Sequence, residues 1–122
     1  LSSGFKESGS EGAALEESIA GMCRTRGVHL LGPNTLGLLN TANNLHVLVG
    51  EELPPRGGPS IISQSSSLCS AFLRQLPDVG LGAAKVVNLG NKAGVTEVEC
   101  LRALGRDQGT TVIAGYLEDI ED

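Results

Sequence analysis

The sequence predicts an α/β protein built on a parallel sheet. From residue 60 onward, short apolar runs rich in Val and Ile alternate with helical segments of about ten residues, which is the pattern of βαβ units. The chain also has 17 glycines among 122 residues, which suits a fold with many tight strand–helix turns, and its aromatic content is only 2%. We therefore expect parallel strands that are joined by right-handed crossovers.

The N-terminal part predicts one helix between two short strands. Residues 1–5 are expected to end a strand, and Ser10 is expected to cap a helix that runs to about Arg26 and stops at Gly27. Residues 28–31 are apolar and predict a second strand, which leads into the Gly32–Gly37 turn. The helix is expected to present one apolar face, formed by Leu15, Ile19, Met22 and Cys23.

The middle of the chain predicts a domain boundary. Periodicity is lost between residues 40 and 59, and residues 51–59 carry the Pro and Gly pattern of a linker. We expect the back of one α/β domain in residues 1–50, a linker at 51–59 and the front of a second α/β domain in residues 60–122.

The second half predicts a regular alternation of elements. Strands are expected at 60–63, 84–89 and 111–117, and helices at 66–76, ending before Pro77, and at 97–106. Thr96 and Glu99 have the spacing of a capping box at the start of the second helix. These elements predict three parallel strands in the spatial order 2-1-3, with two flanking helices.

A serine-rich turn provides the main candidate site. The residues from Ser63 to Ser67 join an apolar strand to an apolar helix, so hydroxyl groups and the free N–H groups of a helix N-terminus face outward together. The two later strands, 84–89 and 111–117, lead into Gly90-Asn91-Lys92 and Glu118. Because the carboxyl ends of parallel strands meet at one edge, we expect one crevice that suits an anion. The alternative is an ordinary serine N-cap.

Composition excludes several other classes of protein. The net charge is −5 and the nine Lys and Arg residues are scattered, which argues against a nucleic-acid surface. The chain has no apolar run of about 18 residues and no signal-peptide pattern, so we expect no membrane span and a cytoplasmic location. Cys23, Cys69 and Cys100 are widely spaced, which predicts buried thiols in a reduced compartment and neither a disulfide nor a metal set.

Four motifs carry a resemblance to a known family. Gly4-Phe5-Lys6-Glu7, Gly32-Pro33-Asn34, Ile62-Ser63-Gln64-Ser65 and Leu89-Gly90-Asn91-Lys92-Ala93 occur in the family order, with family-like spacing. With them the chain resembles the NDP-forming acyl-CoA synthetases, the ADP-forming acetate–CoA ligases related to the succinyl-CoA synthetase α subunit. The resemblance implies the end of a Rossmann-like CoA-binding domain, followed by the first half of a flavodoxin-like domain.

The resemblance also implies a reaction. An acid–CoA ligase of this family interconverts acyl-CoA, ADP and phosphate with acid, CoA and ATP through a phosphohistidine, which is expected outside this chain. Coenzyme A, ATP or ADP, and phosphate are the implied cofactors and substrates, together with a small acyl-CoA. An ATP-grasp domain or subunit is the implied partner and supplies Mg²⁺ with the nucleotide, in an oligomeric parent. We expect the isolated chain to be inactive.

Site residues are carried over from the resemblance by position. Ser63, Ser65 and Ser66 are implied to bind the transferred phosphoryl group, and Glu118 to orient the absent phosphohistidine. Ser66 departs from the family, because Gly usually follows Ser65. Glu118 alone has the alternative of a solvated surface residue, in a run of charges that includes Asp119, Glu121 and Asp122.

A second group of residues is implied near coenzyme A. Asn34 matches a family residue close to the junction of CoA and the phosphoryl site, and Ser3 and Gly4 lie near the expected CoA groove. Asn34 has the alternative of a turn asparagine that bonds its own backbone. Gly94 is a further departure, since an acidic residue is usual there.

Two other functions remain open from the sequence. One is a ligase-like regulatory module, binding CoA or a nucleotide, of a protein lysine acetyltransferase. The other is a plain nucleotide-binding Rossmann protein, which the lack of a GxGxxG motif after a strand disfavours. Neither histidine is expected to be catalytic: His29 falls in an apolar strand, and His46 falls in the irregular connection.

Overall fold

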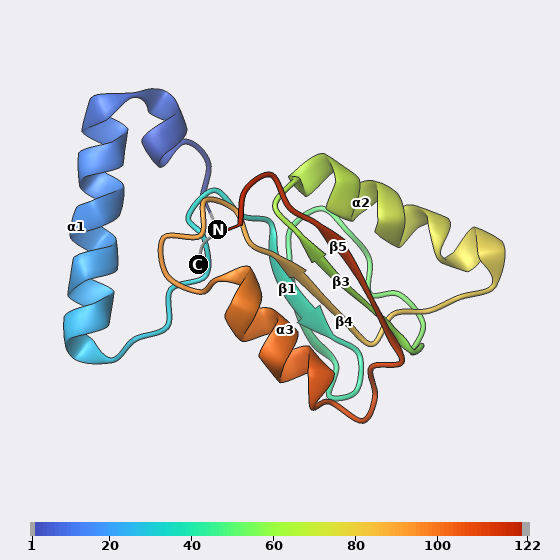
Figure 1. Ribbon diagram of the computed structural model, residues 1–122. Helices are drawn as coiled ribbons and strands as arrows, with labels where there is room; N and C mark the ends of the chain where they lie inside the picture. The colour runs from blue at the N-terminus through green and yellow to red at the C-terminus, as the bar shows by residue number, and fades with distance from the viewer. Residues whose placement is uncertain (1, 121–122) are drawn as a thin grey trace.

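A computed structural model describes residues 2–120 of the chain (Figure 1). The elements in chain order are the 3-10 helix η1 (Phe5–Ser8), α1 (Ser10–Arg26), β1 (Gly37–Asn40), β2 (Leu45–Leu48), β3 (Pro59–Ser63), α2 (Ser66–Gln75), the 3-10 helix η2 (Pro77–Val79), β4 (Lys85–Asn88), α3 (Glu97–Gly105) and β5 (Val112–Tyr116).

The sheet has five strands in the order β2-β1-β4-β3-β5. Strands β4, β3 and β5 are parallel, so the predicted order 2-1-3 of the second half is confirmed. The expectation of a parallel sheet is wrong for the rest, because β1 pairs antiparallel with both β4 and β2. For β1 and β2 the reason is a hairpin in the stretch where periodicity was lost: residues 41–44 turn the chain back, with Asn44 in the left-handed conformation at φ 56°.

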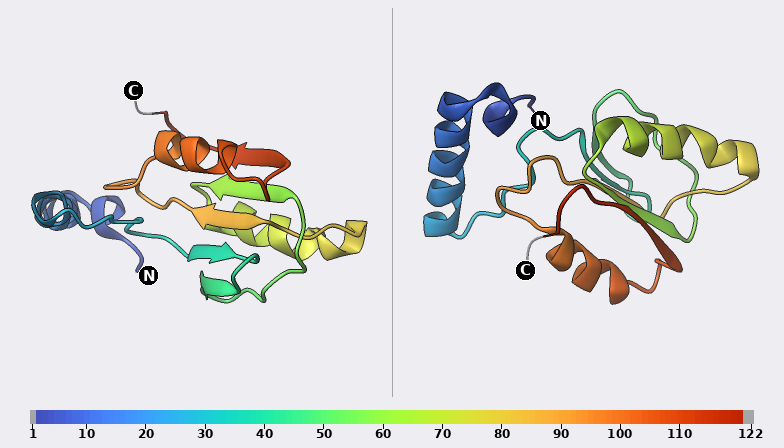
Figure 2. Two further views of the ribbon diagram at one scale, coloured as in Figure 1. Left: turned by 90° about the horizontal axis from the view of Figure 1, so that it is seen from below. Right: turned by 45° about the horizontal axis from the view of Figure 1, so that its top comes forward.

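Helices cover both faces of the sheet, as Figures 1 and 2 show for α2 and α3. One core cluster packs Cys69 and Leu73 of α2 against the sheet, and the other packs Cys100 and Leu104 of α3 against the opposite face. Ile61 and Ile62 of the central strand β3 are both buried, one in each cluster. A central parallel strand that is apolar on both faces requires this double cover.

The predicted helix boundaries in the second half are close to those observed. Helix α2 begins after Ser65, whose hydroxyl accepts a hydrogen bond from the N–H of Leu68 at 3.3 Å, and ends before Pro77. At the start of α3, the Glu99 carboxylate accepts a hydrogen bond from the N–H of Thr96 at 3.0 Å. Local capping chemistry therefore sets both helix starts.

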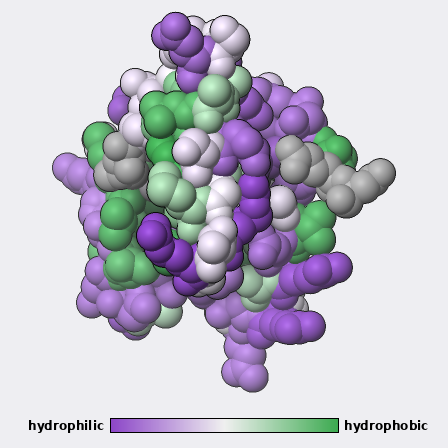
Figure 3. Space-filling model, turned by 90° about the vertical axis from the view of Figure 1, so that its left-hand side faces the viewer, coloured by the Kyte–Doolittle hydropathy of each residue, from purple (hydrophilic) through white to green (hydrophobic). Residues whose placement is uncertain are grey.

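Helix α1 stands to one side of the sheet (Figure 1). Its end at Gly27, which is left-handed at φ 65°, is confirmed, but Ser10 is the first helical residue and Gly9 is the N-cap. The expected apolar face is also wrong, because Leu15 and Met22 are 54% and 50% exposed. Figure 3 views the molecule from this side and shows separate apolar patches among polar ones. Because α1 stands apart from the sheet, Leu15 and Met22 stay exposed, although Ala20 of the same helix is buried.

The two short strands predicted near the N-terminus do not form. Residues 28–31 run beside the loop that follows β4, where the N–H of Val95 donates to the carbonyl of Leu30 at 2.8 Å. Ser2 forms only an isolated bridge with Thr35, and η1 begins at Phe5, while residue 1 lies outside the described residues. In residues 2–120, no helix is both long enough and apolar enough to traverse a bilayer.

Candidate functional site

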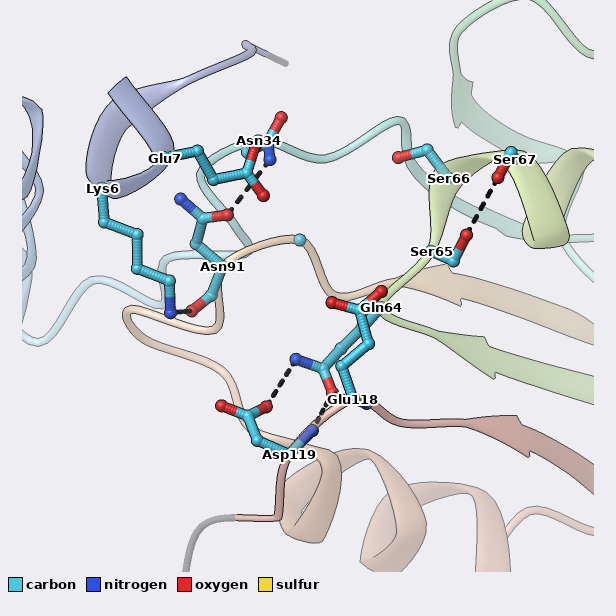
Figure 4. A pocket seen from close by; sticks show the side chains of 11 residues that line it. Lys6, Glu7, Asn34, Gln64, Ser65, Ser66, Ser67, Asn91, Glu118 and Asp119 are labelled. Carbon is cyan, nitrogen blue, oxygen red and sulfur yellow. Dashed lines mark hydrogen bonds between the residues drawn. The ribbon is translucent and has the colours of Figure 1, made fainter. Parts of the chain in front are cut away.

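A pocket of about 570 Å³ lies at the carboxyl edge of the parallel strands (Figure 4). Four of the predicted site residues line it, namely Asn34, Ser65, Ser66 and Glu118. The pocket is also lined by Lys6, Glu7, Gln64, Ser67, Gly90, Asn91 and Asp119. The strand-end rule therefore brings the serine turn and Glu118 together in space, as the sequence predicts.

The serine turn is held by its own hydroxyl groups. Ser65 caps α2, and its hydroxyl lies 3.0 Å from that of Ser67. Ser63 is fully buried, and its hydroxyl donates to the carbonyl of Ser65 at 2.7 Å. The structure thus places Ser63 as a support for the turn and not in the pocket lining. The first N–H groups of α2 have no carbonyl partner within the helix, and Ser66 and Ser67, which carry two of them, line the pocket.

Asn88, at the end of β4, connects the turn to its neighbours. Its fully buried amide donates to the carbonyl of Ser63 at 2.8 Å and accepts from the N–H of Leu36 at 2.7 Å. The hydroxyl of Ser66 donates to the same amide oxygen at 3.1 Å. One side chain therefore fixes three loops, whereas the sequence pattern indicates only that Asn88 lies in a strand.

Gln64 connects the turn to the end of β5. Its amide oxygen accepts hydrogen bonds from the N–H groups of Glu118 at 2.7 Å and Asp119 at 3.3 Å. Its amide N–H₂ donates to Oδ1 of Asp119 at 2.6 Å. Figure 4 shows the Glu118 carboxylate directed toward the serine turn, while Gln64 reaches down to Asp119. Gln64 belongs to the Ile62-Ser63-Gln64-Ser65 motif, but its side-chain partners lie about fifty residues away along the chain, so the motif does not indicate them.

Lys92 supplies a buried positive charge behind this wall of the pocket. It is 3% exposed, and its ammonium lies 3.0 Å from Oε2 of Glu97 and 2.8 Å from Oδ1 of Asp119. Burial lowers the pKa of Lys92, but hydrogen bonds to Asp119 and Glu97 outweigh it and the pKa is raised overall. Hydrogen bonds from Lys92 and then Gln64 hold the pKa of Asp119 below its ordinary range. Both groups are therefore charged at neutral pH.

The opposite wall is built around Asn91. Its amide oxygen accepts from the side chain of Asn34 at 3.2 Å, and its amide N–H₂ donates to the buried carboxylate of Glu16 at 2.8 Å. The ammonium of Lys6 donates to the carbonyl of Asn91 at 3.0 Å. Asn34 is thus tied through Asn91 to α1. The same amide donates to the carbonyl of Gly4 at 3.1 Å, whereas neither Gly4 nor the exposed Ser3 lines the pocket.

Close backbone contacts explain two glycines in this region. A Cβ at Gly90, which has φ 61°, would lie 2.2 Å from the carbonyl oxygen of Pro33. A Cβ at Gly94 would lie 2.4 Å from the carbonyl oxygen of Leu30. The loop after β4 therefore packs tightly on residues 30–34, and the acidic residue that the resemblance expects at position 94 has no room here.

The pocket offers both hydrogen-bond donors and acceptors. The serine turn and the start of α2 provide hydroxyl and N–H donors that suit an anion, and Lys6 adds a positive charge. Glu7, Glu118 and Asp119 are acceptors that suit an N–H group. His29 and His46 are exposed and do not line the pocket, and His29 lies outside any strand, contrary to the expectation.

Comparisons with known proteins give a consistent set of matches. The family model described as the succinyl-CoA ligase like flavodoxin domain matches residues 56–122. The ADP-forming acetate–CoA ligase I of Archaeoglobus fulgidus is 40% identical over 122 residues, which are 100% of this chain and 18% of that protein. The ADP-forming 4-hydroxybutyrate–CoA ligase of Nitrosopumilus maritimus is 34% identical over 124 residues, which cover 100% of this chain and 18% of that protein.

A solved structure matches nearly the whole fold. It is the dinucleotide forming acetyl-coenzyme A synthetase 1 of Ca. Korarchaeum cryptofilum in complex with phosphate and ADP, with a TM-score of 0.93 and 34% identity over 99% of this chain and 26% of that chain. This chain therefore spans between a sixth and a third of the length of the relatives that it matches.

Proposed function

This chain belongs to the family of succinyl-CoA ligase like flavodoxin domains, and from that premise we propose that it forms part of an NDP-forming acid–CoA ligase. The proposed reaction converts acyl-CoA, ADP and phosphate to acid, CoA and ATP, reversibly. Support comes from relatives that are named as ADP-forming CoA ligases and that match the chain over its full length.

One observation carries the proposal. The serine turn at the start of α2 and the Glu118 carboxylate at the end of β5 line the same pocket, although more than fifty residues separate them. A phosphoryl group on a histidine nitrogen needs hydrogen-bond donors for its oxygens. The other nitrogen of the imidazole ring carries an N–H, which needs an acceptor. The pocket offers donors on one side and an acceptor on the other.

Three steps follow from this assignment. Phosphate displaces CoA from the acyl group, which leaves an acyl phosphate. The phosphoryl group then passes to a histidine nitrogen, which releases the acid, and finally to ADP, which becomes ATP. Ser65 and Ser66, with the first N–H groups of α2, are proposed to hold the phosphoryl oxygens, with Ser63 supporting the turn. Glu118 is proposed to accept the second imidazole N–H, which fixes the tautomer.

The remaining substrates and partners follow from the family. We assign Asn34 to the junction with coenzyme A, near Ser3 and Gly4. We also propose residues 1–50 as the end of a CoA-binding domain, 51–59 as a linker and 60–122 as the ligase domain, although strands from both sides of that linker share one sheet.

A Pyrococcus furiosus relative, 33% identical, is named as an alpha subunit, which supports a partner subunit or domain of the ATP-grasp type. We also propose that Mg²⁺ enters with the nucleotide of that partner, as the resemblance implies. Within residues 2–120 no cluster of three or more acidic, Cys or His residues could hold a metal ion.

Phosphorylation tests the proposal directly. The complete ligase that contains this chain is incubated with acetyl-CoA and labelled phosphate, without ADP, and acid-labile phosphohistidine is measured. We expect a labelled protein that loses its label to ADP, and a Glu118→Gln variant that labels at least about tenfold more slowly. The isolated 122-residue chain should not label. Label on His29 or His46 of the isolated chain, or no label on the complete ligase, would contradict the proposal.

A further inference from the structure

Within the proposed function, on which this inference rests, we infer that Gln64 is a positioning residue for Glu118. Its side-chain amide holds the segment just after β5, so that the Glu118 carboxylate faces the serine turn. Among residues 2–120, the structure shows no hydrogen bond between the Gln64 side chain and the Glu118 carboxylate itself.

The sheet explains why such a clamp is needed. The last paired residues of β3 and β5 are Ser63 and Tyr116, so the backbone of residue 118 lies beyond the ladder. At this point β3 turns into the start of α2, and no further strand backbone is available. The amide oxygen of Gln64 takes over by accepting from the N–H groups of Glu118 and Asp119. The side chain thus extends the pairing of the two strands by two residues.

A second anchor fixes the other end of the clamp. The amide N–H₂ of Gln64 donates to Asp119, and the same carboxylate oxygen lies 2.8 Å from the buried ammonium of Lys92. Lys92 also donates to the carbonyl oxygen of Asp119 at 3.0 Å. Asp119 is therefore held from two sides, and in this arrangement the exposed Glu118 carboxylate is directed toward the pocket (Figure 4).

The serine turn and the carboxylate are coupled through this one residue. Gln64 directly precedes Ser65, the N-cap of α2, and its own N–H donates to the carbonyl of Tyr116 at 3.0 Å. A shift of the turn when a phosphoryl group binds is therefore transmitted to the end of β5. This arrangement keeps the distance between the two sides of the pocket fixed during phosphoryl transfer. The rate of transfer depends steeply on that distance.

A reversal of hydrogen-bond polarity tests the inference in the complete ligase. Gln64→Met keeps the length of the side chain and removes its three hydrogen bonds, whereas Gln64→Glu places a second carboxylate against Asp119. We expect both to slow phosphohistidine formation by about tenfold to a hundredfold, with the KM for phosphate changed less than about threefold. The double variant Gln64→Glu/Asp119→Asn restores a donor–acceptor pair but removes the charge that faces Lys92, so it should recover part of the rate lost in Gln64→Glu. Gln75→Met, an exposed residue at the end of α2, is the matched control and should change nothing.

Amide hydrogen exchange provides a readout that does not depend on activity. In Gln64→Met, the N–H groups of Glu118 and Asp119 should exchange faster than in the unsubstituted ligase, while those of β3 should not. Normal labelling kinetics in Gln64→Met, or no recovery in the double variant, would overturn the positioning role alone. A complete ligase that forms no phosphohistidine before any substitution would overturn the proposed function itself, whatever the exchange shows.

Discussion

The hydroxyl of Ser66 donates a hydrogen bond to the amide oxygen of Asn88 at 3.1 Å, and Asn88 is fully buried. Ser66 is the residue that replaces the glycine expected from the resemblance, at the first position of α2. Its side chain is therefore bound to the end of β4. The added hydroxyl strengthens the connection between two loops of the pocket.

Ser66→Gly should consequently have a small effect. We expect it to cost about 0.5–1.5 kcal/mol of stability, because one hydrogen bond to Asn88 is lost while Leu36 still satisfies the amide oxygen. Phosphohistidine formation in the complete ligase should stay within about threefold, because the backbone N–H of residue 66 remains to bind the phosphoryl oxygens. An increase of tenfold or more would instead show that the Ser66 side chain crowds the phosphoryl group.

Ser65 should be more sensitive to substitution than Ser66. Ser65→Ala removes the cap of α2, which costs about 1 kcal/mol of stability, and one hydroxyl group from the pocket. We expect phosphoryl transfer to weaken more than CoA binding, by about threefold to tenfold. Ser65→Val should act more strongly, because a branched side chain obstructs the N–H groups of the turn. Phosphorylation that is intact in both variants would reduce the serine turn to a helix cap.

Asp119 should titrate below its ordinary pKa of 3.8. Because hydrogen bonds from Lys92 and then Gln64 favour its ionised form, its contribution to stability is present above that ordinary value and is lost as the pH falls through the lowered pKa. Carboxyl ¹³C NMR of the protein should show this midpoint, and Lys92→Met should move it upward. Asp107, whose pKa is lowered by a hydrogen bond from Lys85, should not respond to that substitution.

Gly94 should not tolerate any side chain. A Cβ there meets a backbone oxygen of Leu30 at 2.4 Å, so Gly94→Ala and Gly94→Asp should each destabilise the protein by about 1–3 kcal/mol in denaturant unfolding. Gly105→Ala, at the end of α3 with nothing within 4 Å of the added carbon, is the control and should be tolerated. A stable Gly94→Asp variant would mean that residues 28–31 lie elsewhere.

The three thiols should differ in reactivity. Burial, with a smaller contribution from nearby carboxylates, raises the pKa of Cys69 and of Cys100 to about 11, so roughly one in a thousand is a thiolate at pH 8. Iodoacetamide should therefore label only the partly exposed Cys23 in the native protein, as read by mass spectrometry. In urea all three should react. Rapid native labelling of Cys69 would contradict the packing of α2 on the sheet.

Local signals explain what could be predicted of the fold. The alternation after residue 59 and the capping residues Ser65 and Thr96 are short-range features, and they gave β3, α2, β4, α3 and β5 in the right order. The hairpin 37–48 was missed because its strands have four residues each and β2 is mostly exposed, so little alternation marks them. Residues 28–31 are apolar but pack on a loop, and this depends on a contact sixty residues away.

The residues of the candidate site also differ in whether short-range signals could predict them. Ser65 and Glu118 could be predicted because strand ends of a parallel sheet share an edge. Gln64, Asn88 and Lys92 act through hydrogen bonds that cross between loops, and no spacing in the sequence indicates such partners. A lysine in a loop is normally expected to be exposed, so the sequence gives no reason to expect that Lys92 is buried.

The place of β4 in the sheet determines when the sheet can form during synthesis of the chain. β4 lies between β1 and β3, yet a ribosome synthesises it after both. Until residues 85–88 have left the ribosome, the hairpin and β3 share no strand pairing, and each waits with an open edge. The last of these three strands to emerge is the one that joins the others. Synonymous codon changes that slow translation just before residue 85 should therefore lengthen the lifetime of a nascent chain with two unpaired edges, the state most open to capture by chaperones.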